Sequence, residues 1–88
     1  MIMKTKSGFE YEIDKAAITD DWELVEDLVA ADSGNTAAGI RAMKAILGDK
    51  TYEALKEHVR NEEGRVSAIK MQAEFLEILN QAGEETKN

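Results

Sequence analysis

Hydrophobic and polar residues alternate near the start of the chain, which is the two-residue period of a strand with one buried face. The hydrophobic residues of this alternation are Phe9, Tyr11 and Ile13, and the intervening residues are acids. A turn at Ser7 and Gly8 would join this strand to the preceding residues, so we expect a β-hairpin over residues 1–14. An isolated hairpin is only marginally stable in water, so we expect helices to cover its aromatic face.

The next segment, ITDDWELVEDLV at residues 18–29, has the three-to-four-residue spacing of an amphipathic helix. Its expected apolar stripe consists of Trp22, Val25, Leu28 and Val29, and the acids Glu23, Glu26 and Asp27 lie on the opposite side. Asp20 or Asp21 can cap the helix, and acids in its first turn suit the macrodipole. We therefore expect solvated acids, and a Trp22 mostly buried against the aromatic face of the hairpin.

Three further amphipathic helices are expected after the turn residues 32–35. The second helix begins at Thr36, carries Ile40, Met43 and Leu47, and ends at Gly48. The third, capped by Asp49, carries Tyr52, Leu55 and Val59 before the break at residues 61–64. The fourth begins at Ser67, carries Met71, Phe75, Ile78, Leu79 and Ala82, and ends at Gly83.

These patterns predict a mainly α fold in which about four amphipathic helices pack with a short N-terminal β-hairpin. We expect one globular domain over residues 1–83, with its helical part at 19–83 and a frayed tail at 84–88. The net charge of −7 disfavours binding to nucleic acid, and no apolar run approaches the roughly 20 residues that span a bilayer. With no export signal and no cysteine, we expect a soluble cytoplasmic protein that is stabilised by packing alone.

Candidate catalytic or ligand-binding residues are few. His58 is the single histidine, so it cannot form a two-histidine metal site, and no cysteine can complete one. The DSGN stretch lacks the later ligands of a calcium loop, and the glycines lack phosphate-loop spacing. We therefore predict no catalytic, metal or cofactor-binding residue and no enzymatic activity. Gly39, inside the second helix, could allow close helix contact or could simply weaken the helix.

The fourth helix is apolar over an unusually wide arc. Ile69 and Leu76, seven residues apart, extend the stripe to about half the circumference, with Leu79 at the border. One interpretation is a central helix packed on two sides by its neighbours. The other is that Ile69, Leu76 and Leu79 bind another chain, either a partner protein or a second copy.

Two longer blocks carry a family resemblance. DDWELVEDLV at residues 20–29 and the segment from Leu47 to Leu79, together with FEYEID at residues 9–14, resemble the small tail assembly chaperones of long-tailed bacteriophages and of prophages in Gram-positive bacteria. The resemblance implies a non-enzymatic protein that binds the tape measure protein during tail morphogenesis and helps bring tail tube subunits to it. It implies no cofactor and transfers no catalytic residue.

Two other functions compete with this one. A structural virion or adaptor protein would remain in the finished particle, where a chaperone would not. An acidic host regulator or inhibitor would bind a basic partner with strong salt sensitivity.

Overall fold

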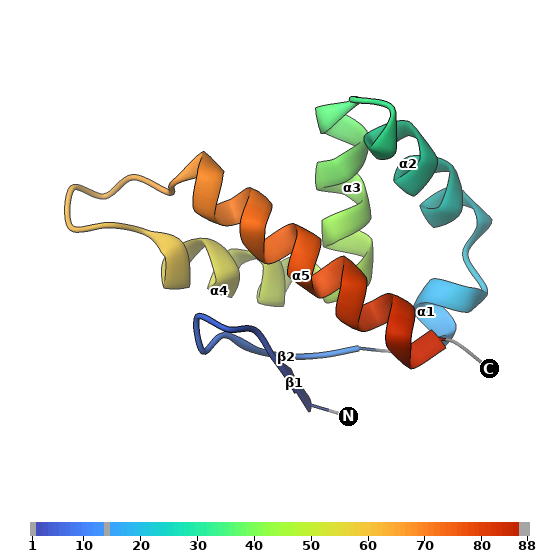
Figure 1. The fold of residues 1–88 in the computed structure, drawn as a ribbon, viewed down its shortest axis with the longest axis horizontal. Coiled ribbons are helices and arrows are strands. Elements are labelled where there is room, and N and C mark those ends of the chain that lie inside the picture. Colours follow the sequence, from blue (N-terminus) through green and yellow to red (C-terminus); the bar gives the residue numbers. More distant parts are fainter. Residues whose placement is uncertain (1, 14, 87–88) are drawn as a thin grey trace.

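The computed structural model describes residues 2–13 and 15–86 and confirms a mainly α fold with an N-terminal two-stranded hairpin (Figure 1). The strands are β1 (Ile2–Lys4) and β2 (Glu10–Glu12). The helices are α1 (Lys15–Thr19), α2 (Trp22–Asp32), α3 (Thr36–Leu47), α4 (Asp49–Val59) and α5 (Ala68–Thr86). Helices α2 and α3 pack as a pair, α5 runs across the body, and the α4–α5 loop projects from one end.

The hairpin is antiparallel and has the expected facing. Met3 pairs with Tyr11, and the strands close through a turn in which the Gly8 amide donates to the Thr5 carbonyl at 2.9 Å. Gly8 has φ +94°, a conformation that favours glycine. Phe9 and Tyr11 are buried and the flanking acids of β2 are exposed, so the alternation located this strand correctly.

Local capping residues fix most helix starts. Asp21 accepts a hydrogen bond from the Leu24 amide at 3.0 Å, Asn35 accepts one from the Ala38 amide at 3.0 Å, and Ser67 accepts one from the Lys70 amide at 3.2 Å. These side chains satisfy amides that have no partner within their helix. The expected cap at Asp49 is wrong, because Asp49 is already helical and Gly48, at φ +84°, lies between α3 and α4.

Two expected boundaries also differ from the structure. Helix α1 occupies Lys15–Thr19, so helical structure begins earlier than residue 19. Helix α5 continues past Gly83 to Thr86, so the expected helix end at Gly83 is wrong. A glycine costs a helix only about 1 kcal/mol against alanine, and no proline follows to end it. Residues 87 and 88 lie outside the described part.

The core lies between the hairpin and the four longer helices. Its buried cluster contains Phe9, Tyr11, Leu24, Ala42, Met43, Ile46, Leu47, Leu55, Val59 and Ile78. The expected burial of Trp22 is wrong: its side chain is 73% exposed, and Leu24 is the buried residue of α2 at 2%. Leu24 and the half-buried Leu28 face inward, whereas Trp22, Val25 and Val29 face solvent. The apolar arc of α2 is wide, and α3 packs against the edge of this arc that lies away from Trp22.

Gly39 lies where α2 and the Phe75 ring of α5 pack against α3. A Cβ atom at this position would lie 3.2 Å from the Cε2 atom of Phe75 and 3.5 Å from the Ala31 Cβ. Gly39 is buried and has an ordinary helical φ, so the value of glycine here is its small size. Of the two readings of Gly39, close helix contact is the one the structure shows.

Candidate functional site

An apolar groove of about 480 Å³ lies beside this helix contact. Gly39 of α3 packs against Phe75 of α5. The next residue along each helix, Ile40 and Leu76, lines a wall of the groove. Both are exposed, Ile40 at 44% and Leu76 at 63%. The remaining apolar lining includes Met43 from α3, Tyr52 from α4, Val66 from the loop and Met71 from α5. The groove therefore offers an uncovered apolar surface built mainly from α3, α4 and α5, with Ala31 added from α2.

The charged side chains nearest the groove lining are two lysines, one of which is paired with Glu53. Among the described residues that line the groove, Lys56 is the only charged one. Its ammonium lies 5.6 Å from the centre of the Tyr52 ring, and the ammonium of Lys44 lies 5.4 Å from that centre. Each distance is short enough for a cation–π contact. A ligand in this groove would thus meet apolar walls and a basic border at Tyr52.

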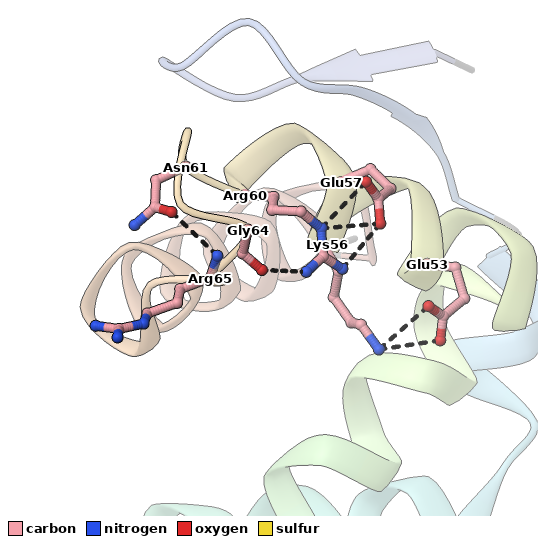
Figure 2. A network of polar contacts seen from close by, with 7 residues as sticks. All are labelled: Glu53, Lys56, Glu57, Arg60, Asn61, Gly64 and Arg65. Atoms are coloured by element: carbon pink, nitrogen blue, oxygen red, sulfur yellow. Dashed lines mark hydrogen bonds and ion pairs between the residues drawn. The ribbon is translucent and has the colours of Figure 1, made fainter.

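A polar network holds the loop wall of the groove in place (Figure 2). The Arg60 guanidinium donates to the Glu57 carboxylate at 2.8 Å and to the Gly64 carbonyl at 2.6 Å. The hydrogen bond and charge of Arg60 lower the pKa of Glu57, and those of Glu57 raise the pKa of Arg60. Arg60 also pairs with Val66 as an isolated β-bridge, which positions Val66 at the groove.

Two other residues of this network, Asn61 in the loop and Glu53 on α4, also form polar contacts. The Asn61 carboxamide oxygen accepts from the Arg65 amide at 3.0 Å and from the Glu63 amide at 2.9 Å, which closes the turn. Glu53 pairs with Lys56 at 3.1 Å, one turn apart on α4 (Figure 2). This pair holds the Lys56 side chain beside Tyr52.

The three residues predicted to bind a partner have different environments. Leu76 lines the groove. Ile69 is 81% exposed but lies outside the groove lining, nearer the start of α5. Leu79 is half-buried and packs against the core cluster. The interpretation of the wide arc as wholly packed by neighbouring helices is therefore wrong for Ile69 and Leu76, and Leu79 belongs with the core.

Sequence reasoning missed the α3 wall of the groove. Ile40 was placed in the core stripe of its helix, yet it is exposed, while Ala38, Ala42 and Ile46 are buried. The signal was the run of small residues at 37–39 and 42, which allows Ala31 of α2 and the Phe75 ring of α5 to pack against α3 next to Ile40. Only the packed arrangement shows that Ile40 and Leu76 share one groove.

A second candidate is a polar cluster between the hairpin turn and helices α4 and α5. The Ser7 hydroxyl lies 3.0 Å from His58 Nε2 and donates to Glu74 Oε1 at 2.9 Å. A serine nucleophile would instead give its proton to the histidine, which an acid would orient. Ser7 donates instead to Glu74, an acceptor that it shares with Thr5, and the direction of its hydrogen bond with His58 Nε2 depends on the imidazole tautomer. We therefore interpret the cluster as a structural contact.

The same face of α5 continues to bind the hairpin. Buried Thr5 donates to Glu74 at 2.8 Å, the Lys6 amide donates to Glu77 at 2.8 Å, and Gln81 donates to the Lys4 carbonyl at 3.0 Å. The Tyr11 hydroxyl donates to Gln81, and burial, aided by the charges of Glu77 and Glu74, raises the pKa of Tyr11 to about 12. Glu74 and Glu77 thus hold the hairpin against α5.

Comparisons with protein families, with curated proteins and with solved structures find no match to this chain. Within residues 2–13 and 15–86, no group of three or more histidine, aspartate or glutamate side chains could hold a metal ion. None of the helices in this described part is long and apolar enough to cross a membrane. The apolar groove is therefore the feature on which we base a functional proposal.

Proposed function

We propose that this protein is a phage or prophage tail assembly chaperone that holds apolar helical segments of a tape measure protein in the groove between α3, α4 and α5. The observation that carries the proposal is the pair of exposed apolar residues, Ile40 and Leu76, on opposite walls of one groove. An amphipathic helix binds such a groove by its apolar face. Shielding that face would keep a long helical partner from aggregating before it is assembled.

The resemblance supports the same assignment. Its second block, from Leu47 to Leu79, contains α4, the loop and most of α5, and thus supplies Tyr52, Val66 and Leu76 to the groove. The α3 wall lies outside that block, so the groove itself was not part of the resemblance.

Co-expression with helical fragments of a tape measure protein tests this proposal. The double variant Ile40→Gln with Leu76→Gln should lose co-purification and leave the fragments insoluble, while its own thermal midpoint stays within a few degrees, because exposed positions contribute little to stability. Ile69→Gln is the control, at a still more exposed isoleucine outside the groove lining. Retained binding by the double variant would refute the groove as the site.

Mass spectrometry of purified tails separates this proposal from a structural virion protein. A chaperone leaves the particle before it is complete, so the chain should be absent from mature tails. Its presence there in stoichiometric amounts would favour the virion or adaptor role.

A further inference from the structure

The outer face of α2 carries a second uncovered apolar surface, formed by Trp22, Val25 and Val29 and called here the α2 stripe. Trp22 is 73% exposed and Val29 63%. On the helical wheel the exposed acids Glu26 and Asp32 border this stripe on its two sides. No lysine or arginine occurs between residues 16 and 40, so every charged side chain of α2 is acidic.

The stripe and the groove are both apolar, and the charges at their borders are of opposite sign. Acids border the stripe, whereas Lys44 and the Glu53-paired Lys56 lie beside Tyr52 of the groove. We propose that α2 of one copy docks its Trp22 stripe in the groove of a second copy. Tryptophan is enriched among the residues that dominate interface energetics, so Trp22 would be the anchor of this contact.

The two surfaces cannot meet within one molecule. Ala31, near the end of α2, lines the groove of its own chain, and on a helical wheel it lies roughly opposite Val29. The stripe therefore points away from its own groove, and Trp22 lies about 14 Å along the helix from Ala31. Only a second copy can bring an α2 stripe into the groove.

The interface joins two different surfaces, so each copy keeps one free stripe and one free groove. Such a head-to-tail contact propagates into a ring or an open chain rather than stopping at a symmetric dimer. One helix face in one groove is also small beside a standard interface of about 1,600 Å², so the association should be weak and dependent on concentration. This inference does not rest on the proposed function, although a partner helix in the groove would compete with it.

Mixing two variants tests the contact. The stripe variant, Trp22→Gln with Val29→Gln, keeps the groove, and the groove variant, Ile40→Gln with Leu76→Gln, keeps the stripe. In sedimentation velocity each alone should associate at least about thirtyfold more weakly than the unchanged protein. The mixture should form a dimer and nothing larger, because it contains one intact stripe and one intact groove.

Fluorescence gives an independent readout of the same mixture. Trp22 is the sole tryptophan, so in the mixture only the groove variant has tryptophan emission. Docking should shift its emission to shorter wavelength as the stripe variant is added. A mixture that stays monomeric with unshifted emission, or a stripe variant that associates like the unchanged protein, would overturn the proposal.

A charge reversal examines the basic border. Lys44→Glu, beside the Tyr52 ring of the groove lining, should weaken self-association, whereas Lys50→Glu, the same change at an exposed lysine near the start of α4, should have little effect. Equal effects of both changes would mean that net charge, rather than the groove border, controls association. Co-purification of the stripe variant with tape measure fragments separates the two proposals, since that binding needs only the groove.

Discussion

Leu24 and Trp22 offer a direct test of which side of α2 packs into the protein. Leu24→Ala removes a side chain that is 2% exposed and should cost about 2 to 5 kcal/mol through lost burial and the cavity left behind. The free energy of unfolding of a chain this size is about 4 to 13 kcal/mol, so the loss is a large part of it. Trp22→Ala, at a side chain 73% exposed, should change it by about 0.5 kcal/mol or less.

Thermal unfolding followed by far-ultraviolet circular dichroism measures both variants. Each kcal/mol shifts the midpoint of so small a domain by about 4 to 8 °C, so Leu24→Ala should lower it by at least about 8 °C. Trp22→Ala should lower it by less than about 4 °C. Dilute samples are needed, so that self-association does not contribute. Unfolding by Trp22→Ala together with tolerance of Leu24→Ala would refute the orientation of α2, and a buried-type tryptophan emission in dilute protein would do the same.

Three further predictions concern the hairpin and the helix contact at Gly39. The pKa of the Tyr11 hydroxyl is about 12 in the folded protein and about 10 in the unfolded chain. Stability should therefore be lost as the pH rises from 10 to 12, and Tyr11→Phe should flatten that loss in denaturant titrations. Glu74→Ala should cost about 1 to 3 kcal/mol because it removes the acceptor that the Thr5 and Ser7 hydroxyls share, whereas Glu74→Gln, which keeps an oxygen there, should cost less; equal costs in urea unfolding would contradict this. Gly39→Val should cost about 1 to 3 kcal/mol by forcing α5 from α3, and an unchanged thermal midpoint would show that the contact is looser than described.

The elements that the sequence located well are those whose signals are local. Alternation identifies β2, and the side chains of Asn35 and Ser67 mark the starts of α3 and α5 because each cap bonds an amide three residues away. Leu55, Val59 and Ile78 are buried as their helical spacing predicts. Such patterns need no knowledge of the neighbouring elements.

The errors arise where one helix has two apolar edges. The large hydrophobic residues of α2 are Trp22, Leu24, Val25, Leu28 and Val29. A helical wheel cannot show which edge of this apolar arc packs against α3. The candidate site shows the same limit, because Leu76 could be proposed from its own helix while Ile40 required the packing of α5 against α3. The role of Glu74 was also hidden, since its partners Thr5 and Ser7 lie 69 and 67 residues away in sequence.

Those distant hydrogen bonds have a consequence for the order in which the protein folds. The hairpin is bound to α5 by contacts that close loops of 67 to 77 residues. Closing such a loop is slow because the chain loses conformational entropy before the contacts form. During synthesis β1 and β2 are made before any residue of α5, so Phe9 and Tyr11 lack that cover until the last helix of this chain arrives. The hairpin is thus the segment that a protease or an aggregating neighbour would meet first in a nascent chain.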